Sequence, residues 1–558
     1  MQAHPTDWNP ALHQRPRTQF LSVMSTPEIS SNSKGATAYD ETPYPSKPFP
    51  QTHPNRLAAM AHLFGVQAPD PAKARILELG CADGANLLPM AEQAPGAMFL
   101  GLDSSQIQIA AGKRGIEGAG LKNVELRHQD ILDFPASEGR FDYIIAHGVF
   151  SWVPEPVRER ILAICAEHLT ENGVAYISYN ALPGWNMKRS LRDMMLFHTK
   201  SFSDAPTKVQ QARALLGFLA DSVPTENNAY GLLLQSELGQ MKNQADNFLL
   251  HDILEEENTP FYFHEFVERA ARHGVQYLSE PNIADMLAAN FSDKVRETLG
   301  RLNNQIVAQE QYMDFIRNRT FRQTLLCRAN VGIRRNITPA SLKQFAFRSS
   351  LLNATGPIEL VPGVAVGFSA ANGAQVSSSD AFVKAALWTL LETRGVSAIS
   401  FQDLLDAARS RSRAFLGELP PNRDEVDDVT LQNNLMNLVA KGILDLYAKP
   451  VKVRAGVPEK PQVSALMRYQ AVHSRLVTNR IHQGVSADAA SRYVIAACDG
   501  TRARDEILSE LVARVNEGKL QVNEGPAKVT DLAKIRASLG PVVDTALTSL
   551  ANGGFLAP

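Results

Sequence analysis

Cysteine is scarce in this chain, with four residues in 558 that stand singly and form no Cys-x-x-Cys pair. Such a set favours buried thiols in a reducing compartment over a disulfide framework, and it lacks the spacing of a zinc site. Long apolar runs are also lacking: no stretch approaches the ~20 residues of a membrane span, and the amino terminus has no signal-peptide core. The net charge of −2 argues against nucleic acid or an anionic membrane as an obligatory partner. We therefore expect a cytoplasmic protein without a bound metal and without membrane insertion.

Length and composition indicate several domains. A chain of 558 residues is too long for one hydrophobic core, so two to four domains are expected. Apolar residues make up 44% and charged residues 20%, as in ordinary globular proteins. Residues 1–38 are polar and rich in Pro, Ser, Thr and His, which predicts a disordered tail. Nothing before Met24 has a structural pattern, so a translation start at Met1 or at Met24 stays open.

The most informative stretch is ARILELGCADGAN, residues 74–86. An apolar run is cut by Gly80 and Gly84 and then passes into a segment with helical spacing, which predicts strand, tight turn and helix. Glycine permits positive φ and lets a ligand lie against the main chain. Glu78, near the end of the strand, directs a carboxylate toward the crevice where open α/β sheets bind ligands. An ordinary βα turn is the alternative interpretation.

Four further apolar runs follow, separated by helical patterns. The first ends in Asp103, about 20 residues after the turn, where a carboxylate can accept both ribose hydroxyls. The next contains Asp130 near its end. This alternation predicts an α/β protein with a Rossmann-like, doubly wound parallel sheet. The runs are residues 98–103, 124–131, 141–146 and 174–178.

The acids at successive strand ends separate the candidate cofactors. A dinucleotide fingerprint needs Gly-x-Gly-x-x-Gly and a helix N-terminus free for a pyrophosphate. Here the order is Glu78-x-Gly80-x-Ala82-x-Gly84. Glu78 and Asp83 would repel a phosphate, so a cationic, phosphate-free nucleoside fits better.

This ordered set resembles the motifs of class I S-adenosylmethionine-dependent methyltransferases. The resemblance implies that Glu78 and the turn hold the methionine part of S-adenosylmethionine and that Asp103 holds the ribose. It also implies that Asp130 and Ile131 hold the adenine and that S-adenosylhomocysteine is the product. Ala82 stands where the family has its middle glycine. The predicted cofactor-binding residues are Tyr39, Glu78, Gly80, Cys81, Ala82, Gly84, Asn86, Asp103, Ser104, Asp130, Ile131 and His147.

Two loops at adjacent strand ends predict where the methyl acceptor binds. They are HGVFSWVP at 147–154 and YNALPGW at 179–185, and the absence of Asn-Pro-Pro-Tyr weakens a nucleobase or glutamine acceptor. Residues 39–54 alternate proline with aromatics, which predicts either a linker or a lid in which Tyr39, Tyr44 and Phe49 lie over the crevice. The predicted catalytic residues are Tyr44, His147, Trp152, Tyr179 and Trp185, with His147 or Tyr179 as the polar group.

The two loops, together with YDETPY at 39–44 and QTHP at 51–54, resemble bacterial methyltransferases that carry a methyltransferase regulatory domain. That family includes the rickettsial lysine methyltransferases of outer-membrane proteins. The resemblance implies methylation of a lysine in a protein partner, and a homodimer is a further expectation. Two alternatives stay open: a small-molecule O- or N-methyltransferase, and a non-catalytic S-adenosylmethionine-binding regulatory protein.

The predicted methyltransferase core spans residues 39–185. Residues 186–258 have purely helical patterns, while 259–330 contain two strand-like runs. We therefore predict a helical insertion with a regulatory or substrate role, followed by strands that complete the sheet. An independent all-helical middle domain is the alternative.

The C-terminal part predicts a linker and two similar units. Residues 331–374 are small and polar and predict a linker with short strands. Residues 375–455 and 456–558 each end in helix, glycine and apolar residues, which predicts a tandem pair of winged helices. The segment 431–440, where a recognition helix would lie, has no Lys or Arg. Protein interaction or substrate capture is therefore favoured over DNA binding.

Overall fold

The structure is a computed structural model that describes residues 46–242, 244, 246–255, 257–302, 305–413, 415, 422–454, 456–524 and 527–557. The predicted tail over 1–38, the alternative starts Met1 and Met24, and the predicted site residues Tyr39 and Tyr44 lie outside these ranges. The account below concerns the described part of the chain.

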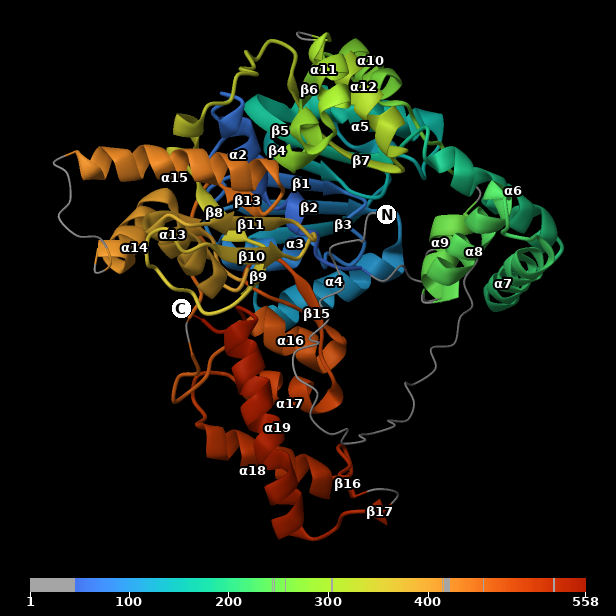
Figure 1. Ribbon diagram of the computed structural model, residues 1–558. Helices are drawn as coiled ribbons and strands as arrows, with labels where there is room; N and C mark the ends of the chain where they lie inside the picture. Colours follow the sequence, from blue (N-terminus) through green and yellow to red (C-terminus); the bar gives the residue numbers. More distant parts are fainter. Residues whose placement is uncertain are drawn as a thin grey trace.

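A seven-stranded sheet lies at the centre of the molecule (Figure 1). Its strand order is β3-β2-β1-β4-β5-β7-β6; β7 is antiparallel to both neighbours, and the other pairs are parallel. The order reverses between β1 and β4, so the crevice outside the carboxyl ends of these two strands is the expected ligand site. The strands are β1 (Arg75–Leu79), β2 (Met98–Asp103), β3 (Val124–His128), β4 (Phe141–Ala146), β5 (Leu169–Asn180), β6 (Val275–Ser279) and β7 (Phe321–Arg328).

Helices cover both faces of the sheet, as the alternation of strands and helices predicts. Side chains of a strand point to opposite faces in turn, so Ile76 belongs to one hydrophobic layer and Leu77 to the other. The predicted Rossmann-like fold is confirmed. The first layer includes α2 (Pro54–Leu63), α3 (Leu87–Gln93) and α4 (Gln106–Ala119), and the second includes α5 (Glu155–His168) and α10 (Phe263–Arg272).

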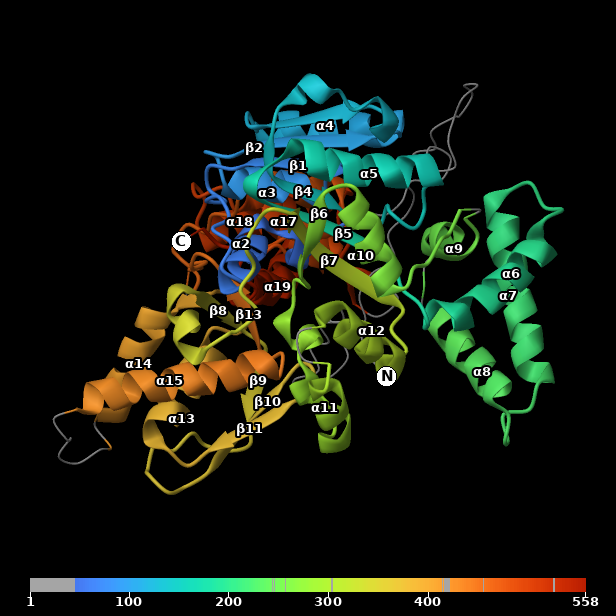
Figure 2. The ribbon, with the colours of Figure 1, turned by 90° about the horizontal axis from the view of Figure 1, so that it is seen from above.

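Four helices between β5 and α10 form a lobe beside the sheet (Figure 2). The lobe has its own hydrophobic cluster, which includes Leu191, Val209 and Leu234. Its two ends lie together, because Ala181 and Phe261 form a parallel bridge and the Leu182 amide donates to the Phe261 carbonyl at 2.9 Å. The helices are α6 (Trp185–Thr199), α7 (Ala205–Ser222), α8 (Ala229–Lys242) and α9 (Asp246–Ile253).

After this lobe the chain returns to complete the central sheet. β6 and β7 both lie within it, so the predicted helical insertion is confirmed and the alternative of an independent all-helical domain is wrong. Between these two strands lie α11 (Asp293–Gly300) and α12 (Ile306–Arg317). Short 3-10 turns lie at Pro50–Thr52, Ile131–Asp133, Ala136–Glu138, Ile283–Met286, Ala288–Asn290 and Pro339–Gln344.

The predicted linker over 331–374 is instead folded. Phe347 of β8, Phe368 of β10 and Leu360 between the strands are buried in one hydrophobic cluster with the helices that follow. The short strands predicted for this segment are present, but their bounds could not be predicted because small polar neighbours weaken the alternation of apolar side chains. They are β8 (Ala346–Ser349), β9 (Leu351–Ala354) and β10 (Val366–Ala370), followed by β11 (Gln375–Ser378).

Two helical units make up the C-terminal part. In the first, β8 pairs with both β12 and β13, so the former linker contributes a strand to this unit. The first unit contains α13 (Ala381–Glu392), β12 (Ile399–Ser400), α14 (Phe401–Arg413), α15 (Arg423–Ala440) and β13 (Leu444–Tyr447). The second contains α16 (Ala465–His473), β14 (Leu476–Thr478), β15 (Gly484–Ser486), α17 (Ala489–Ala497), α18 (Arg504–Asn516), β16 (Asn523–Glu524), β17 (Ala527–Lys528) and α19 (Leu532–Asn552).

Both units dock on the central sheet and its helices. Arg56 of α2 forms an ion pair with Asp445 of β13 at 2.8 Å. α16 lies along α4 (Figure 1), where Tyr469 is so close to Gly118 that a Cβ there would meet its ring. Among the described helices, none is both long and apolar enough to cross a bilayer.

Candidate active site

The turn after β1 is fixed to its neighbours on both sides. The amides of Gly80 and Cys81 both donate to the Leu102 carbonyl at the end of β2, at 2.8 and 2.9 Å. Gly80 has a φ of +74°, and a Cβ there would meet Val149 in the loop after β4. Ala82 has a φ of +49°, a conformation that glycine adopts without strain. The predicted turn is therefore present, with a strained alanine at its centre.

Glu78 lies beneath this turn and is 3% exposed. Its Oε1 accepts a hydrogen bond from Asn86 Nδ2 at 2.7 Å, whereas Oε2 is buried without a partner in the described structure. Burial is the main cause that raises the pKa of Glu78 to about 8, and the charges of Asp103 and Asp83 add to it. Burial also raises the pKa of the Asp83 carboxyl. This side of the crevice therefore favours a positively charged ligand.

The ends of β2 and β3 lie beside the turn. Asp103 accepts hydrogen bonds from the amides of Ala82 and Ser105 at 2.8 and 2.9 Å. The Gln129 amide donates to the Asp103 carbonyl at 2.9 Å, which brings the third strand end alongside. Asp130 is exposed and caps the short turn that contains the buried Ile131. The structure thus brings together the acids that the sequence placed at three strand ends.

Asn86 is the polar centre of the turn and is buried. Its Oδ1 accepts from the Phe49 amide at 2.9 Å and lies 2.8 Å from His482 Nε2. Its Nδ2 donates to Thr52 Oγ1 at 3.1 Å as well as to Glu78. Cys81 and Ser104 have less distinctive places: burial raises the pKa of the Cys81 thiol, and Ser104 is exposed.

The chemistry of this donor set fits S-adenosylmethionine. The unpartnered Glu78 Oε2 suits a cationic group, and a phosphate would meet a row of carboxylates instead. Positive φ at three alternate positions of the turn leaves main-chain groups open to a ligand. Within the described ranges, no three His, Cys, Asp or Glu side chains gather as metal ligands.

On the acceptor side, His147 lies at the end of β4. Its Nδ1 is 2.9 Å from the Tyr176 hydroxyl, and the ring of Phe49 lies against it with centroids 3.7 Å apart. Burial, with the charge of Lys47, lowers the pKa of His147 to about 3. His147 is therefore neutral and a weak base. Phe49 covers it, as the predicted lid requires.

The two loops meet through their tryptophans. The rings of Trp152 and Trp185 pack edge to face with centroids 6.2 Å apart. The loops are joined below them, because the Asn180 amide donates to Ser151 Oγ at 2.9 Å. The Lys188 ammonium lies 5.7 Å from the centre of the Trp185 ring. The predicted combination of two aromatic loops is therefore present.

The prediction of Tyr179 as a catalytic residue and polar group of the acceptor site is wrong, because its side chain lies elsewhere. It is 1% exposed and stacks on Phe266 of α10, on the opposite face of β5 from Tyr176. A shift of three residues along a strand reverses the face, so the tyrosine that contacts His147 is Tyr176. The Tyr179 hydroxyl lies 3.1 Å from Thr324 Oγ1.

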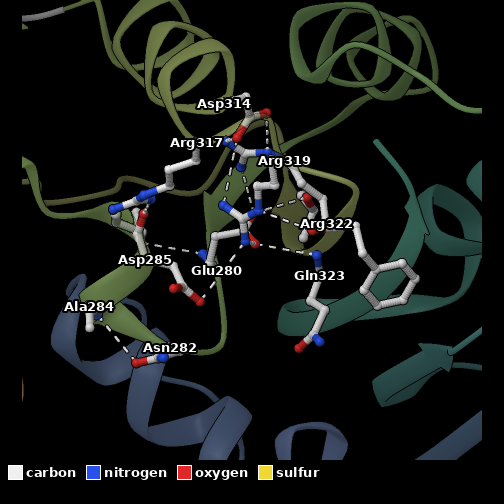
Figure 3. A network of polar contacts seen from close by, with 12 residues as sticks. Glu280, Asn282, Ala284, Asp285, Asp314, Arg317, Arg319, Arg322 and Gln323 are labelled. Atoms are coloured by element: carbon white, nitrogen blue, oxygen red, sulfur yellow. Dashed lines mark hydrogen bonds and ion pairs between the residues drawn. The ribbon is translucent and has the colours of Figure 1, made fainter. Parts of the chain in front are cut away.

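Thr324 leads from Tyr179 into a buried ionic network at the junction of β6, β7 and α12 (Figure 3). Arg322 contacts Glu280 at 2.7 Å, Glu310 at 2.9 Å and Asp314 at 2.7 Å, and all four side chains are fully buried. Arg319 adds a second cation, 2.9 Å from Glu280. Each carboxylate of this network has an arginine partner, so the network holds the added strands and α12 together.

Sequence reasoning missed Asp252, a half-buried carboxylate of α9. Burial raises the pKa of Asp252 to about 7, and the charges of Lys188 and Lys47 oppose this shift. The charge of Lys47 also acts on His147, so Asp252 and His147 share one charged neighbour in the lid segment. Among the described residues, no hydrogen bond or ion pair engages the Asp252 carboxylate. A single Asp in an amphipathic helix has the pattern of a surface residue, which is why it was missed.

Three family models match the chain. A methyltransferase domain matches residues 76–173, and a predicted methyltransferase regulatory domain matches 245–328. The C-terminal winged helix domain of PKMT matches 459–555, which confirms a winged helix in the second C-terminal unit. The model of the regulatory domain covers α10, α12, β6 and β7, so part of it belongs to the central sheet.

Fold, site and family models together define a class I S-adenosylmethionine-dependent methyltransferase. The structure of PKMT2 from Rickettsia typhi is 34% identical, covers 92% of this chain and 100% of its own, and has a TM-score of 0.81. The same protein in complex with AdoHcy has a TM-score of 0.82 at the same identity and coverage. The uncharacterized protein RP789 of Rickettsia prowazekii is 37% identical over 516 residues, 90% of each chain. The chain belongs to the family of methyltransferases that contains PKMT2.

Proposed function

We propose that this enzyme methylates lysine side chains of a protein substrate, and that the acceptor enters between the loops after β4 and β5 and helix α9. The name PKMT of its relative denotes a protein lysine methyltransferase. The observation that carries the proposal is Asp252, a carboxylate that no hydrogen bond or ion pair engages among the described residues and that lies within the electrostatic reach of Lys188 and Lys47. Such a carboxylate suits an incoming ammonium group.

The cofactor is proposed to lie at the turn after β1. Glu78 and the turn would hold its methionine part, Asp103 its ribose hydroxyls, and Asp130 with Ile131 its adenine. Trp152 and Trp185 would form walls of the acceptor channel, and Phe49 with His147 would close it toward the lid. The support is the meeting of these residues along one edge of the sheet, and the AdoHcy complex of PKMT2.

The chain's own residues must prepare the acceptor nitrogen. A lysine ammonium has a pKa near ~10.4 in water and must lose a proton before its nitrogen can form a bond. Asp252, with a pKa of about 7, accepts this proton better than neutral His147, with a pKa of about 3. The bound cofactor supplies an activated methyl group on a sulfonium, and the bond electrons remain with sulfur. Positioning of the two reactants supplies much of the rate.

Labelled S-adenosylmethionine incubated with cell lysate and the purified enzyme tests the acceptor class. Mass spectrometry should find the label on lysine residues of protein. Label in small molecules alone would overturn the proposal and favour a small-molecule methyltransferase.

The role of Asp252 is tested with Asp252→Asn and the matched control Asp221→Asn, an exposed residue of α7 in the same lobe. Asp252→Asn should lower kcat about 100-fold without weakening cofactor binding, since a general base contributes ~10²–10⁴-fold. The wild-type rate should fall below about pH 7, where the Asp252 carboxyl is protonated. An unchanged rate in Asp252→Asn would contradict this role.

A further inference from the structure

The second C-terminal unit reaches into the cofactor turn through one loop. β14 and β15 form a hairpin whose tip includes Asn479 and His482. The tip is tightly held: the His482 amide donates to the Asn479 carbonyl at 3.0 Å, and the Gln483 amide donates to Asn479 Oδ1 at 2.8 Å. His482 has a φ of +64°. A residue in this conformation persists because the surrounding contacts hold it there.

The side chain at this tip is buried against the turn. His482 is 1% exposed, and its Nε2 lies 2.8 Å from Asn86 Oδ1. The ring also lies edge to face with His53 of the lid segment, with centroids 5.3 Å apart. Burial lowers the pKa of His482 well below its usual value, so the ring is neutral. Since the amide oxygen of Asn86 only accepts, Nε2 carries the proton and donates it.

This donor fixes which way the Asn86 amide points. Oδ1 accepts from the Phe49 amide and from His482, and Nδ2 donates to Glu78, while the Thr52 hydroxyl lies 3.2 Å from Oδ1 and 3.1 Å from Nδ2. A rotation that exchanged oxygen and nitrogen would turn the nitrogen toward the Phe49 amide, which only donates, and would take the Nδ2 donor away from Glu78. Removing His482 takes away one of the contacts that hold the amide in this orientation.

We propose that His482 is a positioning residue for cofactor binding, which acts through Asn86 to hold Glu78 with Oε2 directed toward the ligand. The chain His482–Asn86–Glu78 joins residues 396 and 8 positions apart in the sequence. A part of the winged helix domain is thereby part of the cofactor site. The inference rests on the proposed placement of the cofactor at the turn after β1.

The test compares two substitutions at the same buried position, one with an N–H donor and one without. His482→Gln keeps an N–H donor at the same reach, and His482→Leu fills the space without one. Calorimetric titration of S-adenosylmethionine should show binding weakened at least about 10-fold in His482→Leu and within about 3-fold of wild type in His482→Gln. The KM for the protein acceptor should stay unchanged in both. His473→Ala is the matched control, an exposed histidine of α16 in the same unit, and should bind as wild type does.

Three outcomes overturn the proposal: wild-type affinity in His482→Leu, equal losses in the Gln and Leu variants, or an acceptor KM that changes as much as the cofactor affinity. If His482→Leu does not fold, His482→Ala with added imidazole replaces it, and failure of imidazole to restore affinity overturns the proposal. A Glu78→Gln background gives a further check, because the Leu and Gln variants should differ little there.

The variant Asp103→Ala tests the placement of the cofactor independently of the role proposed for His482. Loss of binding in Asp103→Ala without loss in His482→Leu overturns only the positioning role. Full binding in Asp103→Ala overturns the placement of the cofactor itself.

Discussion

Two groups of buried carboxylates lie in this enzyme, one at each side of β5, and they differ in what faces them. At the junction of β7 and α12, Glu280, Glu310 and Asp314 surround Arg322, and Arg319 adds a second cation. At the turn after β1, Glu78 receives a neutral amide on one oxygen, and its other oxygen has no partner in the described structure.

This difference separates a structural cluster from a binding site. Burial of a charge costs free energy unless an opposite charge or hydrogen bonds offset it. The Arg322 network supplies an arginine partner for each of its carboxylates, although Glu310 Oε1 has no hydrogen-bond partner in the described structure. At Glu78 the free energy cost of burying the charged carboxylate is not offset until a cationic ligand binds. A buried carboxylate that no cation of the chain pairs with is therefore a better sign of a ligand site than a shifted pKa alone.

The largest effect is expected when the ionic network around Arg322 is broken. Arg322→Met would leave three buried carboxylates without their main partner, and the free energy of unfolding should fall by about 3–5 kcal/mol. Urea unfolding measures the loss. The control is Arg127→Met, because Arg127 pairs with Glu125 and Glu138 and is 31% exposed. It should cost at most about 1 kcal/mol. Equal losses in the two variants would contradict the comparison.

A smaller effect on stability is expected from the pH dependence of Glu78. Because the folded pKa of Glu78 is raised from 4.5 to about 8, the native state holds this proton more tightly than the unfolded state. Glu78 therefore costs stability increasingly as pH rises from 4.5 to about 8. Relative to Glu78→Gln, the wild type should lose on the order of 3 kcal/mol of unfolding free energy between pH 5 and pH 8.

Urea midpoints of both proteins at the two pH values measure this loss. Saturating S-adenosylhomocysteine should remove most of it in the wild type, since the ligand supplies an ammonium group. If the free energies of unfolding of the wild type and Glu78→Gln changed equally with pH across this range, groups of the chain would already offset the burial of the Glu78 carboxylate.

The smallest effect concerns the strained alanine of the turn. Ala82 has a φ of +49°, and Ala82→Gly should stabilise the protein by about 1 kcal/mol because glycine adopts this conformation freely. Ala85→Gly, in the same turn but without positive φ, should destabilise by about 0.5 kcal/mol through the entropy of the unfolded chain. Thermal unfolding of the two variants should therefore shift in opposite directions. Shifts of the same sign would mean that the strain is relieved elsewhere.

Much of the sheet could be predicted because its strands are long, apolar and bounded by glycines or acids. The predicted runs 98–103 and 141–146 coincide with β2 and β4. For 331–374 the sequence predicted short strands but not their bounds or their place in a folded unit, because four or five residues with small polar neighbours leave too few alternations. Their burial comes from helices that follow later in the chain.

At the site, local motifs were predictable and long-range contacts were not. That the acids Glu78, Asp103 and Asp130 lie near Gly80 could be predicted, because each stands near the end of a strand of one parallel sheet. The face of Tyr179 depends on the strand register, which is set by pairing with β7. His482 and Asp252 reach the site from other units, and no spacing in the sequence relates them to the turn.

The lobe of α6–α9 leaves and rejoins the sheet at Ala181 and Phe261, which lie side by side. A segment of another length can close the same gap, since doubling a loop costs only about 0.6 kcal/mol. The lobe can therefore change in length and sequence during evolution without disturbing the central sheet. Such changes leave the turn after β1 and the strand ends beside it unaltered.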